Sequence, residues 1–270
     1  MRRPAGRSCA IAAVAVLAML AAACSSSSST ATTSTTTSTT GAPLSGSITV
    51  SAASSLTGTF TQLASSFHHV HPGTSIAFNF GSSGALATQI VSGAPADVFA
   101  SASPSDMATV QAAHLVFGKP VTFARNRLEI VVKPGNPLAI HSLAALDKAA
   151  VVAICVPTAP CGSTAQEALA KARVTLPTSK VSLGADVDAT LAQVTTGDAD
   201  ASIVYVTNAA TVGDQGVAVP IPPAQNVSTS YPISVLTTTT DRSLASAWVA
   251  YVLGPVGRAA LLRAQFLPPG

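Results

Sequence analysis

The sequence predicts an α/β protein with a mostly parallel sheet and helices on both of its faces. Between Ile48 and Gly270, short apolar runs typical of buried strands alternate with amphipathic segments of helical period. Several of these helices begin directly after a strand or a tight turn, as in repeated strand–helix–strand units. The 223 residues of this span are enough for one large domain or two ordinary ones.

The elements can be placed in order from local signals. Leu56, Phe60, Leu63 and Phe67 recur at i, i+4, i+7 and i+11, which predicts an apolar stripe on a helix that follows the strand 48–53. Further strands are expected over 76–80, 96–101, 128–132, 151–156, 201–206 and 234–237. Further helices are expected between 81 and 93, after Ser103, and over 162–173, 187–196 and 241–253.

Glycine, proline and serine mark the ends of several helices. Pro72 and Gly73 end the first helix, and Gly93 lies where a C-terminal cap is expected for the second. Ser103 is expected to cap the third helix, with Pro104 at its first position. These signals support the order of elements independently of the apolar pattern.

The first 47 residues are not expected to belong to the fold. Three arginines precede the apolar run 10–23, which is the layout of an export signal and predicts a signal peptide over 1–23. The run ends in three alanines and Cys24, as in a bacterial lipoprotein signal, so we expect a lipid on Cys24; ordinary secretion is the alternative. Residues 24–47 are then a flexible tether, because nearly all of them are Ser, Thr, Gly, Ala or Pro.

The charge of the exported part is balanced. The whole chain has 14 basic and 11 acidic residues, but three of the basic ones lie in the signal, which leaves 11 of each sign. No cluster of lysine or arginine remains in the body, so the electrostatic basis for nucleic-acid binding is missing. No second apolar run is long and uninterrupted enough to cross a membrane.

Two cysteines, Cys155 and Cys161, lie in the body. An even number of cysteines in an exported protein favours one disulfide. A zinc site is the alternative, but the Cys-x5-Cys spacing without a second pair of ligands argues against it. The sequence leaves open whether the two thiols are bonded.

A catalytic serine is one interpretation of the many hydroxyls. The run 81–84, Gly-Ser-Ser-Gly, has the turn but not the Gly-x-Ser-x-Gly spacing of a hydrolase nucleophile. None of the five histidines follows a strand as the base of a triad would, and no paired carboxylates or phosphate-binding glycine motif is evident. His68, His69 and His71 could attract a transition metal, but their place at a helix end favours a solvated surface. We therefore expect no enzyme and no ligands for a metal cation.

Small and hydroxylic residues at helix starts fit an anion site better. These starts are Ser54-Ser55, Ser82-Ser83-Gly84, Pro160-Cys161-Gly162-Ser163 and Asp186-Val187. The first N–H groups of a helix are unpaired and carry partial positive charge, so an anion can bind there without a cationic side chain. In a parallel α/β sheet these starts meet at the carboxyl edge of the strands. The alternative is that Ser55, Ser83 and Ser163 cap their own helices, which is favoured for each of them taken singly.

Five runs carry a more specific signal. They are ITVSAASSLTGTF (48–60), GSSGALATQIVSGAPADVFASAS (81–103), PCGSTAQEALAK (160–171), GADVDATLAQVTTGDADASIVYVTNA (184–209) and YPISVL (231–236). With them the sequence resembles the extracytoplasmic molybdate-binding proteins of ABC transporters, within the periplasmic binding-protein class. The runs cover almost the whole body, and GAPADVFAS and the DV…G-x-x-D-A…IVY series are the specific ones.

The resemblance implies a two-lobed fold of type II, each lobe a mostly parallel sheet flanked by helices, that closes on a tetrahedral dianion. The implied lobes are 48–126 plus 235–270, and 127–234. The family's ligand positions fall on Ser55, Ser83, Cys161, Val187 and Tyr205. Further candidates are Ser54, Ser82 and Gly162. A disulfide between the two body cysteines is not part of the family pattern, and our hypothesis is that it stiffens the turn that aims the N–H groups of Cys161 and Gly162.

The implied ligand set consists of donors only, either hydroxyl or backbone N–H. Monohydrogen phosphate carries a proton that needs an acceptor, and an unmatched polar group in a dry site costs a few kcal/mol. Molybdate and tungstate carry no such proton, whereas sulfate must be rejected by size. The alternatives are a binding protein for another oxyanion such as sulfate and, from a different class, a secreted serine hydrolase.

The resemblance also implies a place in transport. We expect a monomer without a cofactor that binds molybdate or tungstate and delivers it to the membrane permease of an ABC importer. The lipid on Cys24 would anchor it to the outer face of the cell membrane.

Overall fold

Alternating strands and helices make up the fold, seen in a computed structural model that describes residues 43–270. The strands are β1 (Ser45–Ala53), β2 (Gly73–Gly81), β3 (Val98–Ala100), β4 (Val121–Val132), β5 (Val152–Cys155), β6 (Val181–Gly184), β7 (Ala201–Tyr205), β8 (Val217–Pro220) and β9 (Ser228–Val235). The helices are α1 (Thr57–Val70), α2 (Ser83–Val91), α3 (Pro104–Ala112), α4 (Pro160–Lys171), α5 (Val187–Thr195), α6 (Val206–Ala209), α7 (Arg242–Leu253) and α8 (Pro255–Arg263).

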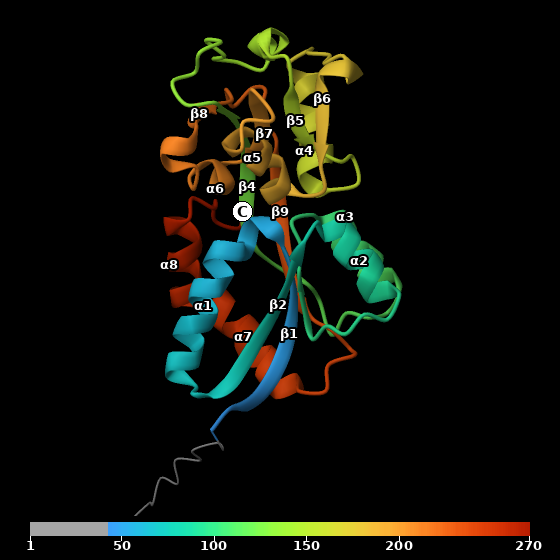
Figure 1. The fold of residues 1–270 in the computed structure, drawn as a ribbon. Helices are drawn as coiled ribbons and strands as arrows, with labels where there is room; N and C mark the ends of the chain where they lie inside the picture. The colour runs from blue at the N-terminus through green and yellow to red at the C-terminus, as the bar shows by residue number, and fades with distance from the viewer. Residues whose placement is uncertain (1–42) are drawn as a thin grey trace, which may run out of the picture. The chain divides into compact units, whose positions relative to one another are not determined.

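The strands join in the order β2-β1-β3-β9-β4-β7-β5-β6, with β8 paired to β4. β1 is parallel to β2 and β3, and β5 is parallel to β6 and β7. Within residues 43–270 every antiparallel pair includes β4 or β9, the two strands that connect the parallel groups (Figure 1). The α/β prediction is confirmed, but the sheet is mixed rather than mostly parallel because the connecting strands run opposite to their neighbours.

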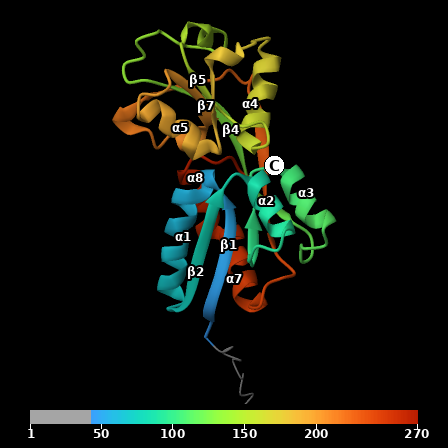
Figure 2. The ribbon, with the colours of Figure 1, turned by 45° about the vertical axis from the view of Figure 1, so that its right-hand side comes forward.

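Apolar side chains form separate cores around the two parallel groups. The first core surrounds β1. In it the rings of Phe60 and Phe67 on α1 pack edge to face against Trp248 of α7, with ring centroids 5.6 and 5.7 Å apart. Phe99 belongs to a smaller apolar cluster with side chains of α2 and α3, while its neighbours Val98 and Ala100 belong to the first core, so Phe99 faces the other side of this sheet. The helices α2 and α3 lie on the side of β1 away from α1 (Figure 2). The second core draws its residues from 128–227. We call the elements around the first core and the smaller cluster lobe 1, and those around the second core lobe 2.

The chain crosses between the lobes along β4 and β9. On β4, Ala124 packs in the core of lobe 1 and Leu128 in that of lobe 2, close to the predicted limit at 126. On the return, Val227 packs in lobe 2 but Tyr231 already packs in lobe 1. The predicted limit at 234 is therefore a few residues too late, because β9 begins at Ser228 and pairs with β3. The other lobe limits remain a prediction.

The fold begins before Ile48. Ser45, Gly46 and Ser47 pair with residues 73–75 of β2, so the predicted tether over 24–47 is wrong at its C-terminal end. The three residues are exposed and pair through backbone groups, which an apolar pattern cannot reveal. The predicted signal over 1–23, the lipid on Cys24 and the tether up to residue 42 lie outside the described residues.

Within residues 43–270 the structure gives little support for a membrane span or a site for a metal cation. No single helix there is long and apolar enough to cross a membrane. Only α7 and α8 taken together have the necessary length and apolar composition, and this pair is bent by 54°. In the same residues no group of three His, Cys, Asp or Glu side chains is placed to hold a metal ion. The His68 ring instead bonds the Thr74 carbonyl through Nδ1 at 2.8 Å, and His71 lies against Phe67.

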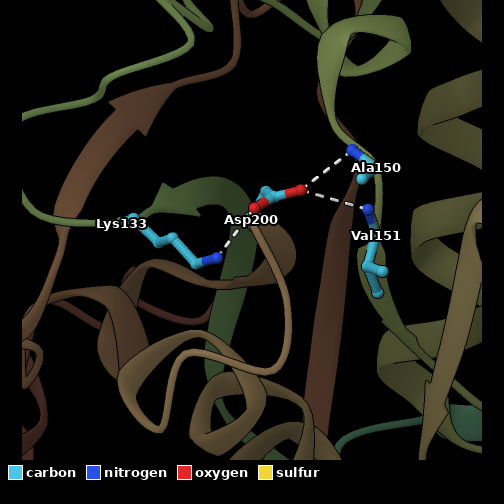
Figure 3. Close-up of polar contacts among 4 residues, drawn as sticks. All are labelled: Lys133, Ala150, Val151 and Asp200. Atoms are coloured by element: carbon cyan, nitrogen blue, oxygen red, sulfur yellow. Dashed lines mark hydrogen bonds and ion pairs between the residues drawn. The ribbon is translucent and has the colours of Figure 1, made fainter.

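Asp200 lies directly before β7, where the amino ends of β5 and β7 meet the carboxyl end of β4 (Figure 3). Its Oδ1 accepts from Lys133 Nζ at 2.8 Å, and its Oδ2 accepts from the N–H groups of Ala150 and Val151 at 2.8 and 3.2 Å. The hydrogen bond from Lys133 is the main reason that the pKa of Asp200 lies below its usual value. Because the folded state lowers this pKa, the stability that Asp200 contributes is present at neutral pH and is lost as the pH falls through the folded value.

Asp200→Asn is expected to lower the free energy of unfolding at pH 7 by about 1–3 kcal/mol, since one amide cannot accept all three bonds. The loss should shrink as the pH falls from about 4 through the lowered folded pKa, below which the wild-type carboxyl is protonated too. Urea unfolding at several pH values measures both effects. Asp214→Asn, at an exposed site, is the matched control. Equal stability of Asp200→Asn and wild type at pH 7 would show that the three hydrogen bonds of Asp200 do not contribute to the free energy of unfolding.

Candidate functional site

A small cavity lies where the two lobes meet, at the carboxyl ends of β1, β2 and β7. Its volume is about 10 Å³, which is room for a compact ligand only. Seven predicted site residues line this cavity: Ser54, Ser55, Ser82, Ser83, Cys161, Val187 and Tyr205. The other lining residues are Ala53, Gly81, Ala102, Pro160 and Asp186. The structure thus brings these positions together, while their role as ligands stays a prediction.

Ser83 begins α2 and is 1% exposed. Its Oγ accepts a hydrogen bond from the backbone N–H of Ala102 at 2.9 Å, and among the described residues the N-cap, Ser82, makes no side-chain capping bond to this helix. The capping alternative is therefore wrong for Ser83. Because the Ala102 bond uses a lone pair, the hydroxyl proton of Ser83 is free to be donated into the cavity.

Ser55 lies in the single 3-10 turn Ser54–Leu56, which connects β1 to α1. Its Oγ is 2.8 Å from the hydroxyl of Tyr231 on β9, and in the described part of the chain neither this turn nor α1 has a side-chain cap at its N-cap residue. Capping is therefore wrong for Ser55 as well. Ser163 donates its hydroxyl to the Pro160 carbonyl at 3.1 Å, so it does not cap α4 either. Thus none of the three serines has the role that was favoured for it singly.

Tyr205 ends β7 and is 1% exposed. Within the described residues its hydroxyl makes no hydrogen bond of good geometry, although the Thr164 hydroxyl, which donates to the Pro160 carbonyl, lies near enough to oppose the rise of the Tyr205 pKa. Burial raises the pKa of Tyr205 well above its ordinary value, and the neighbouring Tyr231 raises it further, so the phenol keeps its proton. A buried hydroxyl without a partner costs about 1–3 kcal/mol, and a ligand that accepts from it removes that cost.

Cys161 and Val187 lie in the first turns of α4 and α5. The first N–H groups of a helix have no partner within it, so both residues offer backbone donors at positive helix ends. Asp186 caps α5 by accepting from the Ala189 N–H at 3.0 Å. A disulfide joins Cys161 to Cys155, at the end of β5, and ties the start of α4 to that strand.

Gly162 does not belong with the donors, and its prediction as a further candidate is corrected. It is not among the residues that line the cavity, and its N–H donates to the Ala159 carbonyl at 2.9 Å. A methyl group on Gly162 would lie within 3.0 Å of the carbonyl oxygens of Val156 and Cys155. Glycine is needed here because α4 starts close against the end of β5.

Two carboxylates near the cavity were not foreseen from the sequence. Asp188 Oδ1 accepts from Asn208 Nδ2 at 2.6 Å, and Oδ2 lies 3.4 Å from Thr57 Oγ1 in lobe 1. Desolvation by the surrounding protein and the charge of Asp186 raise the pKa of Asp188 to about 6, although the residue keeps contact with solvent. Desolvation also raises the pKa of Asp106 to about 6. Both carry negative charge at pH 7, so the donors of the cavity have to outweigh their repulsion of an anion.

Larger cavities lie elsewhere. A polar one of about 340 Å³ shares Ser54 and Ser55 with the site and includes Asp188 and Arg263. An apolar groove of about 500 Å³ lies between α4 and β6, with Leu169 and Leu183 in its lining. Neither brings together unpaired donors as the small cavity does.

Comparisons with known proteins agree with this geometry. A model of bacterial extracellular solute-binding proteins matches residues 48–266. The chain belongs to this family. The molybdate-binding protein ModA of Mycobacterium tuberculosis (strain ATCC 25618 / H37Rv) is 40% identical over 224 residues, which are 83% of this chain and 85% of that protein. The family resemblance inferred from the sequence is therefore confirmed.

Solved structures of the same kind show the fold. The periplasmic molybdate-binding protein of Azotobacter vinelandii superposes with a TM-score of 0.75 and 23% identity, over 83% of this chain and 100% of that chain. The sulfate-binding protein SubI from Mycobacterium tuberculosis H37Rv superposes with a TM-score of 0.73 and 19% identity, over 82% and 86%. The two-lobed solute-binding fold is thus confirmed, and structural likeness alone does not separate molybdate from sulfate.

Proposed function

We propose that this protein binds molybdate or tungstate outside the cytoplasmic membrane and delivers it to the permease of an ABC importer. The observation that carries the proposal is the buried hydroxyl of Tyr205, which has no hydrogen-bond partner within residues 43–270, at a cavity otherwise bounded by serine hydroxyls and helix starts. A relative named for molybdate binding, 40% identical over most of the chain, supports the choice of ligand.

The donors suit a fully deprotonated dianion. Ser55, Ser83 and Tyr205 offer hydroxyl protons, and Cys161 and Val187 offer backbone N–H groups at helix starts. Monohydrogen phosphate would need an acceptor for its proton, which costs a few kcal/mol when it is missing in a dry site. Sulfate needs no acceptor, so its exclusion depends on the size of the cavity.

The donors come from both lobes. Ser55 and Ser83 belong to lobe 1, and Cys161, Val187 and Tyr205 belong to lobe 2. A ligand that bonds to both sets favours the closed arrangement by its higher affinity for it. We propose that the closed protein then docks on the permease as a monomer, and that a lipid on Cys24 keeps it at the outer face of the membrane.

No enzymatic activity and no cofactor are part of this proposal. The hydrogen-bond partners of Ser55 and Ser83 are a tyrosine hydroxyl and a backbone N–H, and neither is a general base for a serine nucleophile. A secreted serine hydrolase is therefore a poor alternative. The binding of another oxyanion such as sulfate is the alternative that the fold allows.

Titration calorimetry of the exported protein with molybdate, tungstate, sulfate and phosphate tests the proposal. We expect tight binding of molybdate and tungstate, weaker binding of sulfate and no binding of phosphate. If sulfate binds as tightly as molybdate, the chain is a general binder of tetrahedral dianions. If no anion gives heat, the proposed function is wrong.

A further inference from the structure

The hydroxyl of Ser55 ends a buried chain of hydrogen bonds that starts on the strands connecting the lobes. Its Oγ is 2.8 Å from the hydroxyl of Tyr231 on β9, and Asn126 Nδ2 on β4 donates to that hydroxyl at 3.3 Å. Tyr231 and Asn126 are both 0% exposed. Neither residue lines the cavity, so neither can bond a ligand there directly.

The orientation of the Asn126 amide is fixed by a backbone group. Asn126 Oδ1 accepts from the N–H of Arg127 at 2.9 Å, and a backbone N–H can only donate. Asn126 Nδ2 must therefore face the other way, where it donates one proton to Tyr231 and the other to Thr207 Oγ1 at 2.9 Å. The amide nitrogen of Asn126 is thus a hydrogen-bond donor to both Tyr231 and Thr207.

The direction of the remaining bonds follows from this. The Tyr231 hydroxyl accepts from Asn126, so its single proton goes to Ser55 Oγ. Burial raises the pKa of Tyr231 well above its ordinary value, although the hydrogen bonds with Ser55 and Asn126 oppose this shift, so the phenol keeps its proton at physiological pH. Ser55 Oγ then accepts from Tyr231 and has its own proton left for the cavity.

We propose that Tyr231 and Asn126 are positioning residues that fix Ser55 as a donor to the bound oxyanion. This inference rests on the proposed function and adds the reason why Ser55 donates rather than accepts. An ordered Ser55 proton stabilises a deprotonated dianion and opposes an anion whose own proton seeks an acceptor. Asn126 lies on β4 and Tyr231 on β9, so the orientation of the Ser55 hydroxyl depends on the two strands that cross between the lobes.

A double-mutant cycle in molybdate affinity, measured by calorimetry, tests the proposal. Tyr231→Phe is expected to weaken molybdate binding about three- to tenfold, as for the loss of one supporting hydrogen bond. In a Ser55→Ala background the same change should alter the affinity by less than about twofold, because Tyr231 acts through Ser55. A purely structural role of Tyr231 would weaken binding equally in both backgrounds, and that result would overturn the proposal.

Matched controls separate this effect from general disturbance. Tyr251→Phe removes a tyrosine hydroxyl from α7, and Thr207→Val removes the other acceptor of Asn126; both should bind molybdate within about twofold of wild type. If Thr207→Val weakens binding as much as Tyr231→Phe, the proposal is wrong. If Tyr231→Phe fails to fold, Asn126→Ala in the same cycle replaces it, with an expected weakening of about two- to threefold that disappears with Ser55→Ala.

The outcomes also distinguish this proposal from the function on which it rests. Wild-type protein that binds no oxyanion removes the proposed function. Wild-type protein that binds molybdate, with Ser55→Ala weakened and Tyr231→Phe unchanged, removes only the positioning role.

Discussion

Tyr205→Phe is expected to weaken molybdate binding by about 1–3 kcal/mol, the cost of losing a donor to a charged group. The same change should leave the ligand-free protein as stable as wild type or slightly more stable. The reason is that the hydroxyl is buried without a partner, so its removal relieves a desolvation cost. Calorimetry gives the affinity, and thermal unfolding without ligand gives the stability.

Weaker molybdate binding together with unchanged or higher stability distinguishes a hydroxyl that donates to the ligand from one with a structural role. Tyr251→Phe is the control, since it removes a hydroxyl at a partly buried site on α7. Unchanged molybdate affinity of Tyr205→Phe would remove Tyr205 from the site. A large loss of stability without ligand would mean that its hydroxyl has a structural role instead.

Gly84→Ala is expected to oppose the approach of the two lobes. A methyl group at Gly84, near the start of α2 in lobe 1, would lie within 3.0 Å of the carbonyl oxygen of Thr158, which precedes α4 in lobe 2. Such overpacking typically costs about 1–3 kcal/mol. The lobes can relieve it by opening, so the cost should appear as weaker molybdate binding, while the stability of the ligand-free protein is kept.

Gly58→Ala is the matched control for this experiment, because a methyl group at Gly58 meets nothing within 4 Å. It should bind molybdate as wild type does. Small-angle scattering with and without molybdate measures how far each variant closes. Gly84→Ala protein that binds and closes like wild type would show that the contact with Thr158 is not part of closure.

Much of the fold can be predicted because the local signals agree. The stripe from Leu56 to Phe67 marks α1, and both Ser103 and Pro104 occupy their predicted places at the start of α3. The strands β6 and β8 and the short helix α6 were not predicted, since they have only four residues each and no apolar period. The early start of β9 was missed because its first residues are polar and pair through the backbone.

The positions of the site residues could be predicted from the sequence, but their hydrogen-bond partners could not. Family motifs place Ser55, Ser83 and Tyr205, and the structure brings them to one cavity. The hydrogen bond between Ser55 and Tyr231 joins residues 176 positions apart, and no local pattern signals such a pair. For the same reason the sequence did not reveal Asp188 facing Thr57 across the lobes.

Crystals of the protein grown with tungstate test the central claim most directly, because tungsten marks its own position by anomalous scattering. We expect one strong peak inside the small cavity, within hydrogen-bond distance, through tungstate oxygens, of Ser55, Ser83 and Tyr205 and of the N–H groups of Cys161 and Val187. A peak outside this cavity, or none at a saturating concentration of tungstate, would contradict the account.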